Sequence, residues 1–187
     1  MSAQLEIFSS VELDVSLHNR QKFCCGVNEL DMFLREKARK ESAANISKTF
    51  VICLKNDPSE IVGYYSLASN RISVSDLPDS MRKKLPKHPF LGVTLLGRLA
   101  VSESYSRAIN PEFKFGETLL TDAKLRAYRA SRSVASYAMV VDVLVGEKGD
   151  PSDFYRKYDF VSFPDNPKKM FLSMETIGLT LRSAGLI

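Results

Sequence analysis

The sequence contains few of the residues that build disulfide frameworks and metal centres. Among its 187 residues there are three cysteines, two histidines and no tryptophan. Cys24, Cys25 and Cys53 form an odd set with two adjacent members, which is a poor pattern for disulfides. No CxxC pair or HExxH helix motif is present. We therefore expect structural thiols and no metal site.

Long apolar runs and flexible tracts are also missing. No stretch approaches the roughly 20 apolar residues of a membrane-spanning helix, and the opening MSAQLEIFSSVELD has neither the basic start nor the apolar core of a signal peptide. A hydrophobic content of 44% is too high for a disordered chain. We expect one soluble, cytoplasmic domain over residues 1–187, with no membrane partner, a core over about 8–176 and a C-terminal extension over 177–187.

The positive charge is modest but unevenly distributed. Lys and Arg number 26 against 22 Asp and Glu, for a formal net charge of +4. Two clusters hold many of the cations: the first is Arg35, Lys37, Arg39 and Lys40, and the second is Arg82, Lys83, Lys84, Lys87 and His88. Such clusters can neutralise phosphates. The first is interleaved with Glu36 and Glu41, so a solvated helix face is an equally open interpretation.

Hydrophobic periodicity predicts alternating strands and helices. Apolar residues recur at helical spacing from Asn28, a plausible N-cap, and again over 116–130, and Pro151 begins a short helix for which Asp150 is a candidate cap. Patterns typical of strands cover 11–16, 49–54, 61–68, 93–101, 136–145 and 169–174. The order of these elements predicts an α/β domain with a mixed sheet.

Five segments, in this order, resemble the GNAT-type N-acetyltransferases. They are FCCGVNELDMFL (23–34), SKTFV with VGYYSLA (47–51 and 62–68), LP with KKLPKHP (77–78 and 83–89), LLGRLAV (95–101) and DFYRKYDFVSFP (153–164). More narrowly, the chain resembles the acetyltransferase toxins of the TacT and AtaT type, which pair with ribbon-helix-helix antitoxins. The resemblance implies the GNAT fold: a central mixed, mostly antiparallel twisted sheet flanked by helices, with central strands that splay at the acetyl-CoA site.

The resemblance also implies how acetyl-CoA, the co-substrate, is used. The backbone of Leu99, Ala100 and Val101 corresponds to the strand that pairs with the pantetheine arm. Tyr155 corresponds to the general acid that protonates the departing thiolate, a role open to a phenol whose ordinary pKa is about 10. Tyr158 lies one turn further on. In the family this position precedes a Gly-Phe pair, whereas in this chain it precedes Asp159-Phe160.

The phosphate-binding loop departs from the family pattern. The family has an Arg/Gln-x-x-Gly-x-Gly/Ala loop, whereas residues 105–116 read YSRAINPEFKFG, with only the last glycine in place. The candidate contacts that remain are Arg107, Phe115, Gly116, Glu117 and Thr118, where a helix N-terminus would offer amides to the pyrophosphate. Alternatively, the loop binds CoA weakly, and the chain is a binding module with the GNAT fold.

For the acceptor, the resemblance implies the α-amine of an aminoacyl-tRNA, whose acetylation blocks translation. The candidate contacts with tRNA are Arg35, Lys37, Arg39, Arg82, Lys83, Lys84 and Arg98. Arg98 could instead form an ion pair at a strand edge. The alternative acceptor is the amine of a small molecule or a protein. A ribbon-helix-helix antitoxin and a second copy of the chain are the partners expected from the resemblance.

Overall fold

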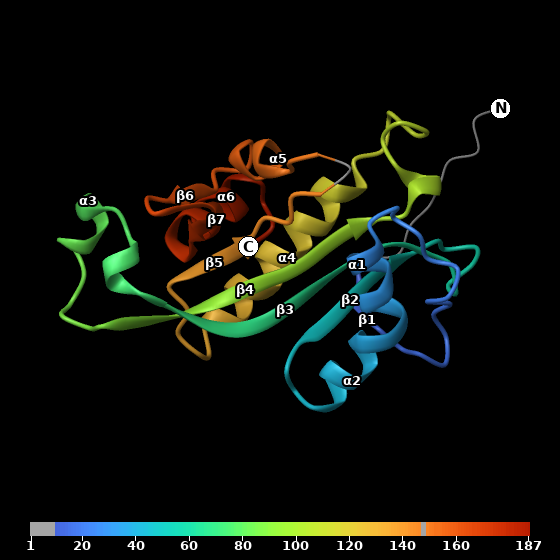
Figure 1. Cartoon of the computed structure of the whole chain (residues 1–187), viewed down its shortest axis with the longest axis horizontal. Helices are drawn as coiled ribbons and strands as arrows, with labels where there is room; N and C mark the ends of the chain where they lie inside the picture. Colours follow the sequence, from blue (N-terminus) through green and yellow to red (C-terminus); the bar gives the residue numbers. More distant parts are fainter. Residues whose placement is uncertain (1–9, 147–148) are drawn as a thin grey trace. The chain divides into compact units, whose positions relative to one another are not determined.

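The structure is a computed structural model that describes residues 10–146 and 149–187 (Figure 1). The chain divides into two compact units. Unit 1 comprises Met1–Leu67 and Arg98–Ala123, and unit 2 comprises Ala68–Gly97 and Lys124–Ile187. Each unit is described separately below. The expectation of a single domain over 1–187 stays a prediction.

The described residues form seven strands, hydrogen-bonded in the order β1-β2-β3-β4-β5-β7-β6. Their bounds are β1 Val11–Glu12, β2 Lys48–Cys53, β3 Ile61–Ser73, β4 Phe90–Val101, β5 Ala138–Asp142, β6 Val161–Phe163 and β7 Asn166–Ser173. In unit 1, β2 pairs antiparallel with β1 and with β3. In unit 2, β4 and β5 are parallel, while β7 is antiparallel to both β5 and β6. The predicted mixed, mostly antiparallel sheet is confirmed.

Helices connect these strands. Their bounds are α1 Asn28–Met32, a π-helix Phe33–Lys37, α2 Ala38–Ala43, α3 Asp79–Arg82, α4 Phe115–Ser131, α5 Ser152–Arg156 and α6 Met174–Ser183, with 3₁₀ turns at Val74–Asp76 and Glu103–Tyr105. The predicted helices at 116–130 and after Pro151 are confirmed as α4 and α5. Within the described part of the chain, no helix combines the length and the apolar content that crossing a membrane requires.

Two local predictions at the start of the chain are wrong. The strand predicted over 11–16 ends at Glu12, because the carboxylate of Asp14 accepts hydrogen bonds from the N–H and the hydroxyl of Ser16 and closes a turn. Asn28 is the first helical residue and not the cap, since Val27 occupies the N-cap position. Asp31 accepts the N–H of Cys25 at 2.8 Å, so a carboxylate within the helix binds the backbone before it.

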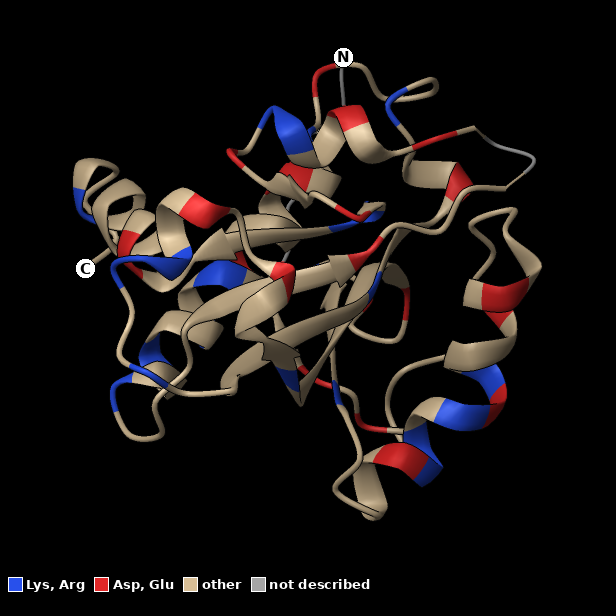
Figure 2. Cartoon of the chain, turned by 60° about the vertical axis from the view of Figure 1, so that its left-hand side comes forward, with Lys and Arg blue, Asp and Glu red and all other residues tan. Residues whose placement is uncertain are grey.

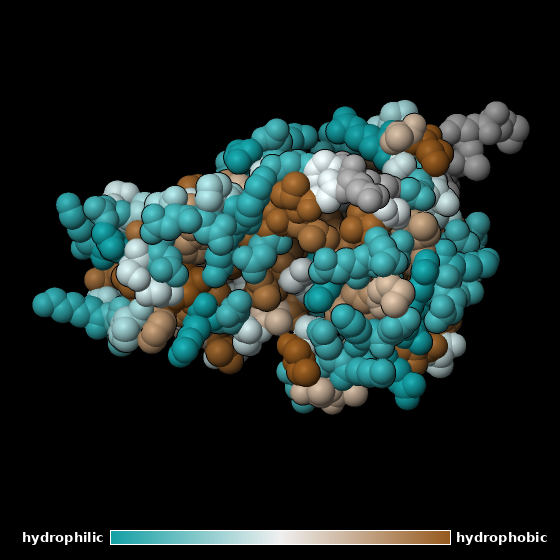
Figure 3. Space-filling view, in the orientation of Figure 1, coloured by the Kyte–Doolittle hydropathy of each residue, from teal (hydrophilic) through white to brown (hydrophobic). Residues whose placement is uncertain are grey.

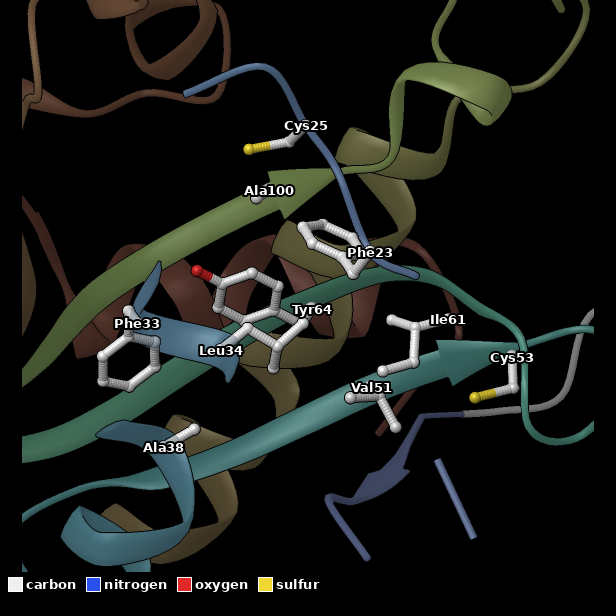
Figure 4. Packing of buried hydrophobic residues seen from close by; sticks show 10 residues of the cluster. All are labelled: Phe23, Cys25, Phe33, Leu34, Ala38, Val51, Cys53, Ile61, Tyr64 and Ala100. Atoms are coloured by element: carbon white, nitrogen blue, oxygen red, sulfur yellow. The ribbon is translucent and has the colours of Figure 1, made fainter. Parts of the chain in front are cut away.

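The core of unit 1 lies between the α1–α2 helical segment and strands β2, β3 and β4. Figure 4 shows its side chains, in which the Phe33 and Tyr64 rings stack with centroids 6.1 Å apart and Phe23 meets Tyr64 edge-on at 5.3 Å. Both Phe33 and Tyr64 are almost completely buried, and each such side chain contributes about 1.5–3 kcal/mol on leaving water. Ala100 belongs to the same cluster, so the end of β4 is anchored on this core.

A close backbone approach at Gly63 joins β3 to β4 in unit 1. A Cβ at this position would lie 2.9 Å from the carbonyl oxygen of Ala100 and 2.8 Å from Cδ1 of Leu119 in α4. The N–H of Ser102 donates to the carbonyl of Val62 at 2.9 Å beside this contact. Only glycine leaves room for the backbone of β4 and the side chain from α4 together.

Unit 2 has a second core, made by β3, β4, β5, β6 and β7 residues. The rings of Phe163 and Phe171 lie 4.8 Å apart in it. Ile177 and Leu181 of α6 are buried, so this helix packs within unit 2. Ser173 is the N-cap of α6, and its hydroxyl accepts the N–H of Thr176 at 3.0 Å. In the space-filling view most visible atoms are hydrophilic (Figure 3).

We predict that Gly63→Ala destabilises the fold by about 1–3 kcal/mol, the range for overpacked interiors, because the Ala100 carbonyl belongs to backbone and cannot move aside as a side chain does. The matched control is Gly92→Ala, in β4, whose Cβ would meet its nearest atom at an ordinary 3.5 Å. Urea unfolding midpoints of the two variants check the prediction. Equal midpoints would show that the close contact at Gly63 does not destabilise the alanine variant.

Candidate active site

The residues predicted for the site divide between the two units. Unit 1 contains the proposed cofactor residues, the first basic cluster and Arg98. Unit 2 contains Tyr155 and the three residues of the second basic cluster that are predicted to contact tRNA, Arg82, Lys83 and Lys84. The contacts of each group lie within its own unit.

Strand β4 extends beyond the segment that pairs with its parallel neighbour, β5. Its pairing with β5 covers Thr94 to Leu96, opposite Met139 to Val141, whereas β4 continues to Val101. Leu99, Ala100 and Val101 therefore lie beyond the parallel register. Of these three, Ala100 is buried in the core of unit 1, and by strand alternation its two neighbours point to the opposite face. The splay expected at the central strands matches the end of this register.

Arg98 lies over an aromatic ring, and none of the described residues forms an ion pair with it. Its guanidinium carbon is 3.7 Å from the centroid of Phe33, a cation–π distance. Phe33 in turn stacks on Tyr64, whose hydroxyl donates to the carbonyl of Leu30 at 2.7 Å. The Nε atom of Arg98 is buried and has no hydrogen-bond partner among the described residues. An unsatisfied charged donor on a rigid ring is suited to a ligand oxygen.

The platform under Arg98 depends on an irregular helix that periodicity did not reveal. Residues Phe33–Lys37 form a π-helix, a wide turn that leaves α-helical carbonyls without their usual partners. Arg20 supplies the missing donor: its Nη1 lies 2.6 Å from the carbonyl oxygen of Arg35 and 3.5 Å from that of Leu34. The spacing of apolar residues could not show this, because both helix types bury Phe33 and Leu34.

The long loop that precedes α4 is ordered by its own contacts. The hydroxyl of Tyr105 donates to Glu60 at 2.8 Å, and the ring of Tyr105 meets Phe115 edge-on at 6.2 Å. Asn110 closes the loop, donating from its backbone to Ser106 and from its side chain to Ser104, at 2.8 and 3.0 Å. The inserted residues therefore fold back on unit 1.

Helix α4 begins at Phe115, so the start predicted at Gly116 is correct within one residue. The first N–H groups of such a 17-residue helix have no acceptor within it, and its dipole favours an anion there. Lys114 lies 3.8 Å from Glu117 in an ion pair, and Arg107 is exposed in the loop. Glu117 and Thr118 occupy the first turn, as the sequence predicts.

Tyr155 is buried in α5, in unit 2. Its ring meets Phe154 at 5.2 Å and Phe160 at 5.5 Å, both edge-on. Burial raises the pKa of Tyr155 to about 12, so the phenol holds its proton at physiological pH. Asp150 supports the helix start, because its carboxylate accepts the N–H and the hydroxyl of Ser152. The N-cap position itself is occupied by Pro151, so the prediction that Asp150 is the cap is wrong by one residue, and its carboxylate closes the turn before the helix.

Tyr158 has different surroundings from Tyr155. The Nζ atoms of Lys124 and Lys157 lie 5.4 and 5.5 Å from the centroid of its ring. Burial lowers the pKa of Lys124, an effect that the nearby Asp159 opposes. These contacts give Tyr158 a packing role between two cations.

The basic residues differ in how much charge they present. Arg35 is half-buried and donates from Nη2 to the carbonyl of Phe23 at 2.5 Å, whereas Lys37 and Arg39 are exposed on a helix whose charges alternate in sign (Figure 2). Arg82 is paired with Asp79. In the same segment Lys83 and Lys84 are exposed.

The described residues contain no group of three or more His, Cys, Asp or Glu side chains placed to hold a metal ion. Cys24 is exposed, whereas Cys25 and Cys53 are buried. Burial raises the pKa of Cys53 to about 12, which keeps this thiol protonated and unreactive.

No protein-family model matches the chain. Among curated proteins, the chain is 32% identical over 154 residues to the tRNA-acetylating toxin of Mycobacterium tuberculosis, an alignment that spans 82% of this chain and 84% of that protein. It is also 28% identical over 169 residues to the probable toxin TacT of Sinorhizobium fredii, spanning 88% of this chain and 90% of that protein.

Solved structures show the same fold. AtaT complexed with acetyl-methionyl-tRNAfMet superposes with a TM-score of 0.81 at 23% identity, covering 94% of this chain and 99% of AtaT. A tyrosine-to-phenylalanine variant of AtaT, bound to the C-terminus of the antitoxin AtaR and to acetyl-CoA, superposes with a TM-score of 0.74 at 22% identity, covering 94% and 98%.

We predict that the fold loses stability in alkali because it buries protonated tyrosines. Burial raises the pKa of Tyr64, and raises those of Tyr105 and Tyr155 to about 12. In the unfolded chain these phenols ionise near pH 10, so above about pH 10 unfolding releases protons and becomes more favourable. The stabilisation is complete below that pH and is lost as the pH rises through about 12. Urea midpoints that stay constant between about pH 9 and 11 would contradict this.

Proposed function

Because this chain belongs to the family of acetyltransferase toxins that includes the tRNA-acetylating toxin of Mycobacterium tuberculosis, we propose that it transfers acetyl from acetyl-CoA to the α-amine of an aminoacyl-tRNA. The observation that carries the proposal is the 32% identity to that toxin over 84% of its length. The early end of the β4–β5 register at Leu96 and Val141 supports it independently, since backbone beyond the register can pair with a ligand.

The residues of unit 1 fit acetyl-CoA, which supplies the acetyl group as a thioester. The backbone of Leu99, Ala100 and Val101 would hold the pantetheine arm. The first amides of α4, at Phe115, Gly116 and Glu117, would hold the pyrophosphate, aided by the charge of Arg107. The N–H of Thr118 already donates to the carbonyl of Lys114 at 3.0 Å, so Thr118 would contribute through its place in the first turn. Because helix amides can bind phosphate without glycines, the departure of the loop from the family pattern is compatible with binding. Glu112 and Glu117 reduce the positive potential there, so we expect weaker binding than a glycine-rich loop gives.

The chemistry needs a neutral amine and one proton donor. An α-amino group has a pKa of about 8, so a useful fraction is neutral at pH 7 without a dedicated base. Its nitrogen attacks the thioester carbonyl, the new N–C bond forms, and the C–S bond breaks. The amine gives up a proton to water, and the departing thiolate takes one from Tyr155. Burial suits Tyr155 to this role because it keeps the phenol protonated.

Exposed cations supply the sequence-independent part of tRNA binding. Lys37 and Arg39 in unit 1, and Lys83 and Lys84 in unit 2, project into solvent and can contact phosphates. Arg98 keeps a free buried Nε donor on the Phe33 ring, and we assign it to a carbonyl or phosphate oxygen of the acceptor. Arg35 supports the π-helix and does not contact RNA in this proposal.

The expected partners follow from the same family. We propose that a ribbon-helix-helix antitoxin neutralises the chain, on the basis that an AtaT structure is bound to the C-terminus of the antitoxin AtaR. A homodimer and a cytoplasmic location, where charged tRNA is found, complete the proposal.

We predict acetylation of charged tRNA and of no simpler amine. With labelled acetyl-CoA, a mixture of charged tRNAs should acquire label that base hydrolysis releases as N-acetyl amino acids. Uncharged tRNA, polyamines and a lysine-containing peptide should stay unlabelled. Label in polyamines or the peptide alone would assign the other acceptor class. Absence of binding heat at millimolar acetyl-CoA in isothermal titration would identify a binding module and end the enzyme proposal.

We predict that Tyr155→Phe leaves the Kd for acetyl-CoA unchanged and lowers kcat about a hundredfold or more, the usual contribution of a positioned general acid. The matched control is Tyr158→Phe, one turn away, which should retain turnover. Titration calorimetry and single-turnover transfer to charged tRNA measure the two quantities. If both variants turn over at the wild-type rate, Tyr155 is not the acid.

A further inference from the structure

Unit 2 contains an open cleft that none of the proposed catalytic or cofactor residues lines. Its volume is about 520 Å³, within the range of small-ligand sites. Three parts of unit 2 surround it: the segment that leads into β4, the end of α4 with the loop that follows, and α6. The polar side chains of its lining that can contact a ligand include His88, Tyr128, Arg132, Tyr137, Glu175 and Arg182.

The positive charge of the cleft comes from two arginines on separate elements, and the carboxylate of Glu175 lies in the same lining. Arg132 follows α4, and Arg182 stands in the last turn of α6. Within the described residues, neither arginine makes an ion pair with a carboxylate. Cations spread around an opening match a chain of phosphates better than they match a single carboxylate. The basic residues Lys83, Lys84 and Lys87 lie just before His88 in the chain, and all three are exposed.

Two tyrosine rings give the cleft faces on which a base can stack. Tyr128 is fixed by α6: a Cβ at Gly178 would lie 2.6 Å from its ring, and Arg182 donates to its hydroxyl at 3.3 Å. Tyr137 is held through its backbone N–H, which donates to Gly92 at 2.8 Å. Rings fixed in this way stack unpaired bases at little cost in conformational entropy. Glu175 adds an acceptor for the exocyclic amine of a base.

We propose that this cleft is a second RNA-contact site that binds an unpaired nucleotide of the acceptor tRNA. The base lies against Tyr128 or Tyr137, and the flanking phosphates contact Arg132 and Arg182. This inference rests on the proposed function, because it takes a charged tRNA as the acceptor. An acidic peptide is the competing occupant, but it makes no use of two rigid aromatic faces.

The test separates binding in the cleft from the chemistry. The variants are Arg132→Ala and the double variant Arg132→Ala with Arg182→Ala. Arg132 is exposed, so its single variant removes charge without disturbing the packing of Tyr128. The matched control is Arg129→Ala, which removes the same charge from an exposed position of α4 outside the cleft. The Kd for acetyl-CoA and the Tm establish that each variant is folded.

We predict that the double variant raises KM for charged tRNA about tenfold or more, with kcat unchanged. Two lost contacts should also reduce the slope of log K against log salt for uncharged tRNA by about 1.4, since each single-strand phosphate contact contributes about 0.7. The control variant should stay near wild type in every measurement.

Two results would overturn the cleft proposal while the proposed function stands. One is a wild-type enzyme that acetylates charged tRNA, with the double variant no different from Arg129→Ala. The other is unchanged tRNA binding in the double variant together with loss of binding to a glutamate-rich peptide. A wild-type chain that binds uncharged tRNA through the cleft but acetylates no charged tRNA would instead defeat the proposed function and leave an RNA site.

Discussion

The close approach of β3 to β4 at Gly63 is the constraint on which unit 1 depends. The carbonyl oxygen of Ala100 in β4 and the side chain of Leu119 in α4 both approach β3 at this glycine, where a single added methyl group would overlap both. Ala100 is thereby fixed beside Tyr64 and the helical core, and α4 is fixed through Leu119. The strand proposed to hold the pantetheine arm and the helix proposed to hold the pyrophosphate therefore share one point of attachment. Packing contacts therefore set the position of this strand relative to this helix, and no catalytic or ligand-binding side chain takes part in those contacts.

The same core holds Arg98 in place. Its guanidinium stacks on the face of Phe33, and this cation–π contact supplies part of the stabilisation that an ion pair would give. The π-helix sets the ring there, and Arg20 satisfies the carbonyls that the wide turn exposes. An ion-paired arginine would have to break its pair before it could bind another oxygen, and among the described residues Arg98 makes no such pair.

Features with a periodic or local origin could be predicted from the sequence. The spacing of Leu119 and Leu120 gave α4, and the proline before Ser152 gave α5. Features that arise from pairs far apart in the chain could not. The π-helix depends on Arg20 reaching the carbonyl of Arg35, and the unit 2 cleft combines residues from three elements. Tyr155 was predicted from a family resemblance alone, since nothing in its neighbouring residues distinguishes it from Tyr158.

The loop over residues 105–116, before α4, shows what a glycine motif can and cannot indicate about a phosphate-binding site. Glycines mark a loop that closes directly on a phosphate, but helix amides bind phosphate whatever their side chains are. In this chain the loop instead folds on itself through Asn110 and is tied to Glu60 by Tyr105. The helix start at Phe115 is preserved, because the inserted residues are accommodated before it. The glycine motif and the helix start are therefore separable: the first amides of α4 are present in this chain although the glycines of the loop are not.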